Sequence, residues 1–343
     1  MKVFRKAADI KVGVIGYGGQ FNMGPQHLGE MCAAGMTPIA VADIDPKRLA
    51  AAKNDYSGIE TYHSPGQMLR KSDVDLITII TPHNTHAALA VQALKAGRHV
   101  VCEKPLAITT AECDRMITAA KRSGTVITTY HNRHWDGCIL NAVKKIHSGA
   151  IGEVYRIEAH MGAWGKPGNW WRSSKSISGG ILYDWGVHLL EYALQIVDGQ
   201  ITEVAGFAKH GHWASKTAWQ ADTNEDEAVV VVRFSNGKWL TLSVTHLDSN
   251  PKKGWLEITG TKGTYVFDGR GWQIMSHRGR NKITTEGKNP KSEGWRYYKN
   301  VADHLVKGEE LVISAEWARR PIHILDLAGR SARLGRTLRA RYS

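Results

Sequence analysis

The sequence of 343 residues has few cysteines, few acidic side chains and no long apolar run. No apolar run reaches the ~18 residues that a membrane span needs. The first residues also lack the apolar core of a signal peptide, so we expect a cytoplasmic protein without membrane contact. The scattered cysteines form neither a CxxC metal pair nor a dense disulfide framework, and we expect reduced thiols at Cys32, Cys102, Cys113 and Cys138.

Histidines are numerous but lack a metal-binding pattern. The chain contains 16 of them, and none belongs to an HExxH or Cys/His spacing. Those spacings mark closed metal sites. We therefore expect no metal.

The scarcity of acidic residues leaves a strong positive charge. The chain has 32 Asp and Glu against 45 Lys and Arg, a formal net charge of +13. The excess is densest near the C-terminus, where a helix would carry one basic stripe formed by Arg330, Arg333, Arg336 and Arg339. A nucleic-acid site would also need a reading element in a known motif, and the sequence has none. We expect a solvated or subunit-contact surface and no nucleic-acid partner.

Tryptophan is absent from the N-terminal part, since all twelve lie at or after Trp135. In that part, short apolar runs alternate with amphipathic helical stretches, which is typical of βαβ units and a parallel sheet. Gly97 and Gly124 fit helix C-caps. We expect helices over residues 85–96 and 109–123, and strands over residues 10–15, 38–42, 76–80, 99–102 and 126–129.

From Gly152 the pattern changes to β-rich segments separated by turns, which indicates a meander of mainly antiparallel strands. We expect one long helix over residues 180–197 and a last helix over residues 315–341. The predicted fold class is α/β, with a first domain over residues 1–130 and a second α/β domain over residues 131–343, whose last helix could pack on either domain. The strands expected in the second domain cover residues 154–163, 201–208, 227–234, 238–246, 255–260 and 263–267.

The first predicted strand runs into a glycine-rich turn. Gly16 and Gly18 fit the first two positions of GxGxxG, where glycine lets the backbone turn tightly and approach a pyrophosphate. Phe21 stands at the third position, whose glycine serves helix–strand packing. Asp43 ends the second strand, where a carboxylate accepts hydrogen bonds from ribose hydroxyls and repels a 2′-phosphate. We expect NAD rather than NADP; the alternative for Asp43, a capping role at the next helix, stays open.

Three motifs follow: TPxxxH at residues 81–86, EKP at residues 103–105 and GGxxxDxGxH at residues 179–188. On these motifs the sequence resembles the Gfo/Idh/MocA family, named for glucose–fructose oxidoreductase and inositol dehydrogenase, over nearly the whole chain. The resemblance implies an N-terminal Rossmann domain and a C-terminal α/β domain with an open, mainly antiparallel sheet. In the family the sheet face often forms subunit contacts, so we expect a homodimer or homotetramer.

The resemblance also implies the cofactor and its site. Family members use NAD(P) to oxidise or reduce a sugar, cyclitol or related carbonyl. The TPxxxH segment flanks the cofactor, and His83 replaces the asparagine usual there. The expected NAD-binding residues are Gly16, Gly18, Gly19, Gln20, Phe21, Asp43, Thr81, Pro82, His83, His86, Glu103 and Lys104.

The family's catalytic lysine, aspartate and histidine fall on Lys104, Asp184 and His188. The chemistry agrees, because removing hydride from a secondary alcohol makes its proton acidic and histidine is a base suited to neutral pH. On the predicted helix, Asp184 and His188 share one face. Lys104 adds a cation that stabilises the developing alkoxide. The alternative is a helix-face Asp–His pair and a surface lysine.

A tryptophan-rich loop lies just before the GGxxxDxGxH motif. Flat aromatic faces suit the C–H faces of sugar rings, and polar side chains supply hydrogen bonds to hydroxyls. Where relatives place an aspartate after the Trp–Arg pair, this chain has Ser173-Ser174-Lys175, which departs from the usual substrate pattern. The expected substrate-binding residues are Lys104, Asn132, Arg133, Trp170, Trp171, Arg172, Asp184 and His188.

These observations predict an NAD-dependent oxidoreductase that transfers a hydride between NAD and a secondary hydroxyl of a sugar, glycoside or cyclitol. A first alternative is redox-neutral glycoside cleavage, in which the substrate is oxidised, loses its glycosidic group and is reduced again. A second alternative is a sugar- or NAD-sensing protein without turnover. The intact Lys104, Asp184 and His188 count against a sensor.

Overall fold

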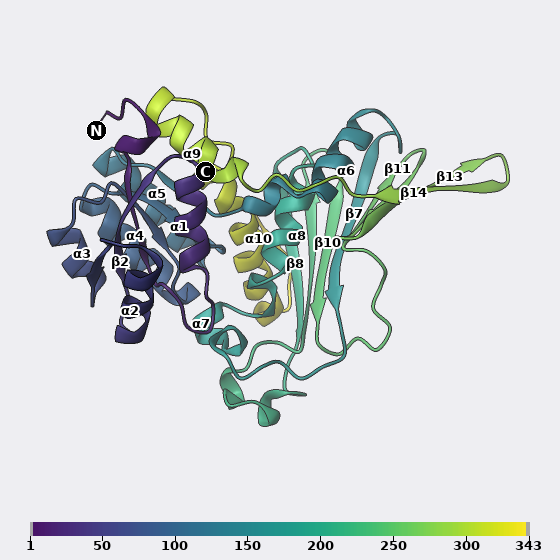
Figure 1. Ribbon diagram of the computed structural model, residues 1–343. Helices are drawn as coiled ribbons and strands as arrows, with labels where there is room; N and C mark the ends of the chain where they lie inside the picture. The colour runs from purple at the N-terminus through teal and green to yellow at the C-terminus, as the bar shows by residue number, and fades with distance from the viewer. Residues whose placement is uncertain (1–2, 341–343) are drawn as a thin grey trace. The chain divides into compact units, whose positions relative to one another are not determined.

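A parallel sheet forms the centre of the N-terminal unit in the computed structural model, which describes residues 3–340. In that range the sheet has six strands in the order β3-β2-β1-β4-β5-β6. Most of this unit is drawn in purple and blue in Figure 1. The order reverses between β1 and β4, so a topological switch point lies at their carboxyl ends, where open α/β sheets bind ligands. The strands are β1 (Lys11–Ile15), β2 (Thr37–Ala42), β3 (Glu60–Tyr62), β4 (Leu76–Ile79), β5 (His99–Cys102) and β6 (Ile127–Thr129).

The helices of this unit begin and end at clear sequence signals. Thr109 caps α5 with a capping box to Glu112, and Gly124 ends it with φ 62°. Strands β4 and β5 are buried at every position, as expected for parallel strands covered on both faces. The helices are α1 (Gly24–Ala33), α2 (Pro46–Asp55), α3 (Pro65–Lys71), α4 (His86–Lys95), α5 (Thr110–Ser123) and α9 (Arg296–Lys307).

The chain divides into two compact units by its internal contacts. Among the described residues, the first contains residues 3–132 together with Trp295–Arg320, and the second contains Arg133–Gly294 and residues 321–340. Residues 295–320, which the sequence analysis assigned to the second domain, thus fold with the first unit. Helix α9 joins it through Tyr297 and Tyr298, each 1% exposed.

The second unit contains a mainly antiparallel sheet with one parallel pair, β7 with β10. Among the described residues it has nine strands in the order β14-β13-β12-β11-β7-β10-β9-β8-β15. The strands are β7 (Val154–Gly162), β8 (Ile201–Lys209), β9 (Glu227–Phe234), β10 (Trp239–Thr245), β11 (Leu256–Gly260), β12 (Gly263–Phe267), β13 (Gly271–Arg278), β14 (Asn281–Lys288) and β15 (Leu338–Arg339).

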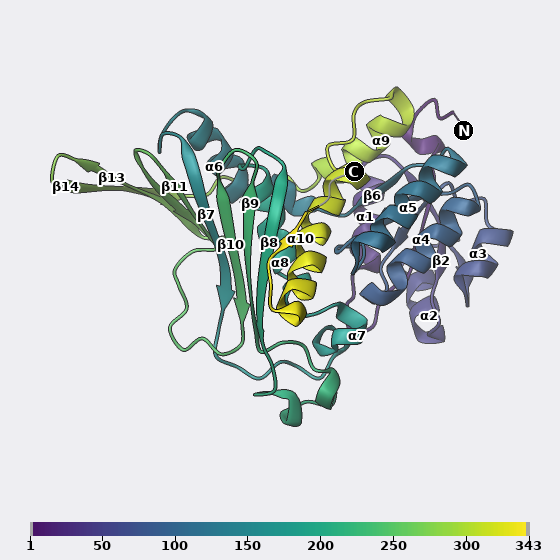
Figure 2. The same ribbon diagram turned by 180° about the vertical axis from the view of Figure 1, so that it is seen from behind.

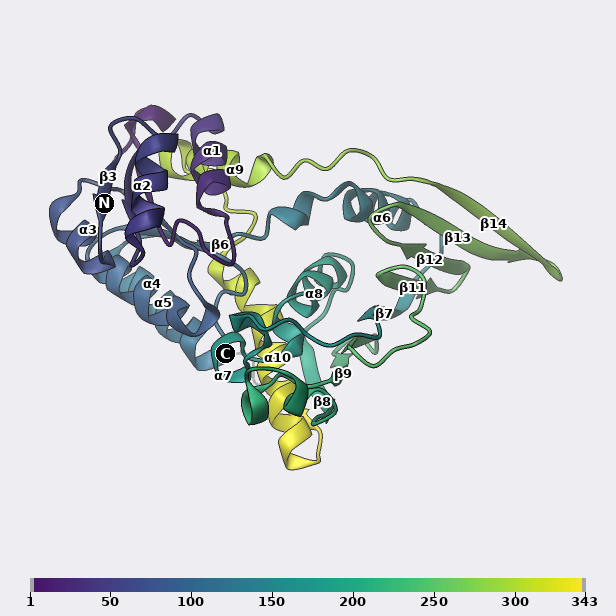
Figure 3. The same ribbon diagram turned by 60° about the horizontal axis from the view of Figure 1, so that its bottom comes forward.

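Helices cover one face of this sheet (Figures 2 and 3). Helix α8 (Gly186–Leu194) packs on β7 and β10 and is buried along its whole length. The second part of α10 (Ala315–Leu334) lies against β8 so closely that a Cβ at Gly206 would be 2.1 Å from the carbonyl oxygen of Ala328. The unit also contains α6 (Gly137–His147) and α7 (Lys175–Ser178).

Short 3₁₀ helices complete the described chain. One of them, η5, lies directly before Asp184 and α8. The 3₁₀ helices are η1 (Ala7–Asp9), η2 (His83–Thr85), η3 (Asn132–Trp135), η4 (Trp171–Ser173), η5 (Ile181–Tyr183), η6 (Ala214–Lys216) and η7 (Gln220–Asp222).

The structure confirms the α/β class with a Rossmann sheet and a mainly antiparallel second sheet, and it corrects two helices. The long helix over residues 180–197 is wrong, because Gly180 has φ 130° and the chain forms η5 before α8 begins at Gly186. The last helix ends at Leu334, because Gly335 takes φ 63°. Arg336 and Arg339 therefore lie outside any basic helical stripe, and Arg341 lies outside the described residues.

Candidate active site

The glycine-rich turn leaves β1 at the switch point. A Cβ at Gly16 (φ 88°) would lie 2.7 Å from the carbonyl oxygen of Ile80. A Cβ added at Gly19 (φ 112°) would have no described atom within 4 Å, so the turn faces open space there. The turn therefore presents backbone to a space that a pyrophosphate could fill, which fits a dinucleotide.

A close backbone contact is made by Gly24, the first residue of α1, which packs against the turn just after β1. A Cβ on Gly24 would lie 2.3 Å from the carbonyl oxygen of Tyr17. This is the packing role of the third glycine in GxGxxG. The sequence analysis noted that Phe21 stands where this glycine belongs and missed Gly24, because the turn is three residues longer than the motif. The spacing Gly16, Gly18, Gly24 was the available signal.

Asp43 supports the turn from the end of β2. Its Oδ2 accepts the Tyr17 N–H at 2.7 Å and its Oδ1 accepts the Asp45 N–H at 2.9 Å. Asp45, not Asp43, is the N-cap of α2, since its side chain accepts the Lys47 N–H. The capping alternative for Asp43 is thus wrong. A carboxylate has acceptor positions beyond two N–H groups, so Asp43 can still receive ribose hydroxyls.

Arg48 was not expected from the sequence. Its Cδ lies 3.1 Å from the position of a Cβ on Gly18, and its Nε lies 3.9 Å from Asp45 Oδ2. A guanidinium therefore stands beside the glycine-rich turn. The available signal in the sequence was an arginine five residues after Asp43, the aspartate at the end of β2.

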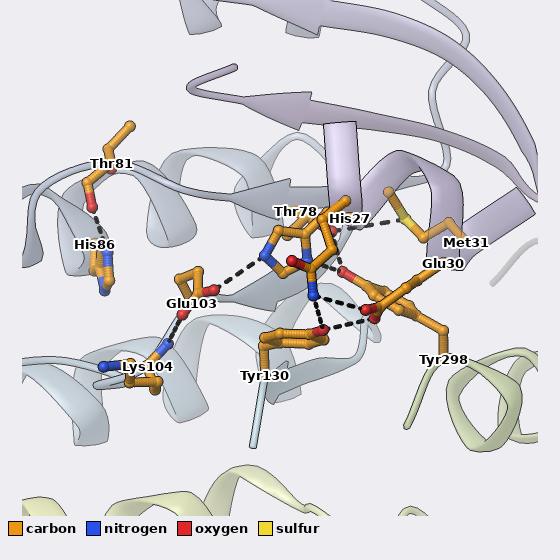
Figure 4. A network of polar contacts seen from close by, with 11 residues as sticks. His27, Glu30, Met31, Thr78, Thr81, His86, Glu103, Lys104, Tyr130 and Tyr298 are labelled. Carbon is orange, nitrogen blue, oxygen red and sulfur yellow. Dashed lines mark hydrogen bonds and ion pairs between the residues drawn. The ribbon is translucent and has the colours of Figure 1, made fainter. Parts of the chain in front are cut away.

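Lys104 is anchored by a buried polar network (Figure 4). Its backbone N–H donates to Glu103 Oε2 at 2.8 Å, and Glu103 Oε1 lies 3.0 Å from His27 Nε2. His27 Nδ1 lies 2.7 Å from the Tyr298 hydroxyl, which lies 3.0 Å from Thr78 Oγ1. The network joins α1, β4, α9 and the end of β5. In Figure 4 the ammonium end of Lys104 points away from His27.

Glu103 is a carboxylate held inside the protein, 4% exposed. Burial alone would raise the pKa of Glu103, but the hydrogen bond and charge of His27, with Lys104, hold that pKa below its usual value. A buried charge of this kind is retained only where partners compensate its desolvation. The conformation at Lys104 therefore depends on His27.

His86 joins the TPxxxH and EKP segments. Its Nδ1 lies 2.8 Å from the carbonyl oxygen of Pro105 and its Nε2 lies 2.9 Å from that of Thr81. Both partners are acceptors, so a neutral ring satisfies one of them and the imidazolium satisfies both. Thr81 Oγ1 lies 2.6 Å from Thr85 Oγ1. His83, in the place of the usual asparagine, is buried in the same turn.

In the second unit, Asp184 forms an ion pair with Arg172. Arg172 Nη1 donates to Asp184 Oδ1 at 2.7 Å. The guanidinium carbon lies 5.0 Å from the ring of Trp170 and 5.2 Å from that of Trp171, within the range of cation–π contacts. The Trp–Trp–Arg loop and the aspartate, expected from the sequence as substrate residues, thus form one cluster.

His188 lies in the first turn of α8, but Asp184 does not share its helix face. Asp184 follows η5 with φ −85° and ψ −75°, two residues before α8 begins. The ring of Trp185 contacts that of His188, with 5.7 Å between centroids, and the guanidinium of Arg133 lies 4.9 Å from the Trp185 ring. Asn132 ends the first unit and Arg133 begins the second.

One turn after His188, α8 carries an unexpected acid. Glu191 is 1% exposed and accepts a hydrogen bond of 2.5 Å from His134 Nδ1. Gln195 donates to its other oxygen at 3.0 Å. Lys104 belongs to the first unit, whereas Asp184, His188 and this Glu191–His134 pair belong to the second.

Two kinds of feature are absent from the described part of the chain. No group of three or more His, Cys, Asp or Glu side chains within residues 3–340 has a metal-binding arrangement. No helix there is both long and apolar enough to cross a membrane.

The sheet order and the glycine-rich turn define a protein with a Rossmann domain of the NAD-binding class. The chain belongs to the GFO/IDH/MocA family: the model described as "Oxidoreductase family, NAD-binding Rossmann fold" matches residues 10–131, and that of the GFO/IDH/MocA C-terminal domain matches residues 139–266. These matches confirm the family that the motifs indicated. They also confirm NAD as the cofactor. The family is one of oxidoreductases.

Individual relatives share less. The chain is 32% identical over 190 residues to the uncharacterized oxidoreductase YdgJ of Escherichia coli. The matched region covers 55% of this chain and 54% of YdgJ, so the match spans about half the length of that relative. It is 29% identical over 270 residues to myo-inositol 2-dehydrogenase of Thermotoga maritima, covering 76% and 75%. A solved structure of an NAD-binding protein from Listeria innocua is 28% identical, covers 96% of each chain and has a TM-score of 0.80.

Proposed function

We propose that the protein is an NAD-dependent dehydrogenase that transfers a hydride between NAD and a secondary hydroxyl of a sugar, glycoside or cyclitol. The observation that carries the proposal is the Asp184–Arg172 pair, whose guanidinium lies against the rings of two tryptophans. Asp184 lies four residues before His188 in the chain. Such a cluster offers hydrogen bonds and flat apolar faces, which together suit a polyhydroxylated ring. One of the relatives is named myo-inositol 2-dehydrogenase.

In the proposed reaction, His188 accepts the hydroxyl proton as the carbon loses its hydride. Lys104 stabilises the negative charge that develops on the oxygen. The turn of residues 16–19 and Asp43 would hold NAD, which would supply the hydride acceptor. Asp184, paired with Arg172, binds a neighbouring hydroxyl and orients the ring.

The buried network behind Lys104 serves the same step. Glu103 holds the Lys104 backbone at a fixed place, and His27 holds Glu103. Preorganised charges cost little reorganisation when the reaction occurs, which is how electrostatic stabilisation accelerates a chemical step. In the proposed reaction, the network therefore positions Lys104.

The test is a screen of sugars, glycosides and inositols with NAD, followed by absorbance of the reduced cofactor. Turnover that produces NADH with an oxidised product supports the proposal. Product formed from a glycoside without accumulation of NADH would indicate the redox-neutral cleavage instead. Binding of a sugar, measured by calorimetry, without any turnover would indicate a sensor.

A further inference from the structure

Residues Asp222–Glu225 bind two segments of the chain that carry the Arg172–Asp184 pair. The first arm is residues 172–176, which contains Arg172, and the second arm is residues 180–184, which ends at Asp184. On the first arm, the Asn224 side-chain amide donates to the carbonyl oxygen of Arg172 at 2.7 Å, and the Asn224 N–H donates to that of Ser173 at 2.9 Å. Asp222 accepts the Ser176 N–H at 3.0 Å and its hydroxyl at 2.8 Å. Three of the contacts use backbone atoms, so they fix the path of the arm rather than one rotamer.

The second arm is the turn that leads into Asp184. Glu225 Oε2 accepts the Ile181 N–H at 3.0 Å, and Ile181 begins η5, whose C-cap is Asp184. Glu225 Oε1 forms an ion pair with Lys175 Nζ at 2.5 Å. A Cβ added to Gly180 would lie 2.7 Å from Glu225 Oε2. The second glycine of the GGxxxDxGxH motif is therefore needed both for its φ of 130° and for the space that this carboxylate occupies.

Glu225 is charged and enclosed, 9% exposed. Burial alone would raise the pKa of Glu225, but the Lys175 ammonium and the backbone N–H of Ile181 hold that pKa below its usual value. A charge-assisted hydrogen bond from a backbone N–H is stronger than one between neutral groups. The carboxylate therefore constrains the turn over a wide pH range.

We propose that Glu225 is a positioning residue for Asp184, and that its hydrogen bond to Ile181 sets the place of the Asp184 carboxylate against Arg172. The inference rests on the proposed function, because it assigns Glu225 a part in that reaction. Glu225 acts through the turn of residues 180–183. Small misplacements of a catalytic group reduce turnover strongly, since the reacting atoms must meet within a narrow range of geometry.

The experiment compares three variants with the unaltered full chain and NAD. Glu225→Ala removes the acceptor for the Ile181 N–H. Glu225→Gln keeps an acceptor oxygen without the charge. Lys175→Met removes the ion pair but leaves the carboxylate on Ile181. Glu158→Gln is the matched control, because Glu158 on β7 also pairs with basic side chains, Arg156 at 3.3 Å and Lys252 at 3.5 Å, and touches neither arm.

Two quantities are measured below the melting temperature of each variant. Amide hydrogen exchange over residues 180–184 should accelerate about tenfold in Glu225→Ala, less in Glu225→Gln, and stay unchanged in Glu158→Gln, because a hydrogen bond to a charged acceptor is lost. With a substrate from the screen, kcat should fall about 10- to 100-fold in Glu225→Ala at unchanged NAD affinity. Lys175→Met should lower the melting temperature, because it leaves the enclosed Glu225 carboxylate without its ion-pair partner.

The outcomes separate a positioning role from a merely structural one. Unchanged exchange over residues 180–184 in Glu225→Ala would overturn the proposal, and so would faster exchange with unchanged kcat. If Glu225→Ala does not fold, Glu225→Gln carries the same two measurements. If the unaltered protein turns over none of the screened compounds, the proposed function fails, while the exchange rates still decide whether Glu225 fixes the turn.

Discussion

Glu103 Oε1 lies 3.0 Å from His27 Nε2, and this contact joins two segments 76 residues apart inside the first unit. The hydroxyl of Tyr298, from α9, holds the other nitrogen of the same imidazole at 2.7 Å. An element from near the C-terminal end of the chain therefore orients the histidine that holds the EKP segment. The contact explains why α9 belongs to the first unit.

Removing His27 should be much more costly than removing the hydroxyl behind it. His27→Phe leaves the Glu103 carboxylate buried without its main partner, and we expect a loss of about 3–5 kcal/mol in the free energy of unfolding. Tyr298→Phe removes one hydroxyl and should lose about 1 kcal/mol. Urea unfolding measures both. Equal losses in the two variants would contradict the role assigned to His27.

Cofactor preference tests Asp43. We expect NAD to be used roughly tenfold or more better than NADP, because the Asp43 carboxylate repels a 2′-phosphate. Asp43→Ser should reduce that preference, measured as the ratio of kcat/KM for the two cofactors. Asp45→Ser, which keeps a capping side chain on α2, is the control and should leave the ratio unchanged. Better use of NADP by the unaltered protein would point to Arg48, beside Gly18, as a phosphate ligand.

The tryptophan loop has its own test. Trp171→Ala removes one of the two rings against the Arg172 guanidinium, and we expect KM for the sugar or cyclitol to rise about tenfold while NAD affinity stays within a few-fold. The reason is that the loop belongs to the second unit and makes the substrate contacts proposed above. A large fall in melting temperature without NAD would instead show that Trp171 is core.

Acid should destabilise the protein through His99. Burial lowers the pKa of His99 from 6.5 to about 4, and its Nδ1 accepts the Val126 N–H at 3.1 Å, which requires an unprotonated nitrogen. The unfolded chain takes up a proton near pH 6.5 and the folded one near pH 4, so stability falls as pH drops through that window, by about 3 kcal/mol for this group. His99→Gln should flatten the decline in urea unfolding between pH 6.5 and 4. An unchanged slope would show that other groups cause it.

Local patterns in the sequence predicted most strands and missed what long-range contacts decide. The buried runs of β4 and β5 and the caps of α5 were predicted within one residue. The hairpin of β13 and β14 was not, because β14 is exposed at every position and has no apolar alternation to detect. At the break before α8 the Ile181 N–H donates to Glu225, 44 residues later in the chain, which no window of neighbouring residues contains.

The candidate site follows the same division. Lys104, Asp184 and His188 came from motifs, whereas their supports did not. His27 looks like one helical residue among others until Glu103 is placed beside it, and Glu191 looks like a surface acid until α8 buries it against His134. Supporting residues are identified by contact, and contacts between distant segments are set by the fold.

The most direct test of the account is the rate of the chemical step in His188→Ala and Lys104→Ala, with the substrate that the screen identifies. We expect kcat to fall about 10²–10⁴-fold in each, because both act on the proton and charge of the reacting hydroxyl. The double variant should fall well short of the product of the two, since groups that act as a unit are not additive. NAD affinity should survive in His188→Ala. Full turnover by His188→Ala, with an intact fold and an unchanged pH profile, would contradict the proposed mechanism.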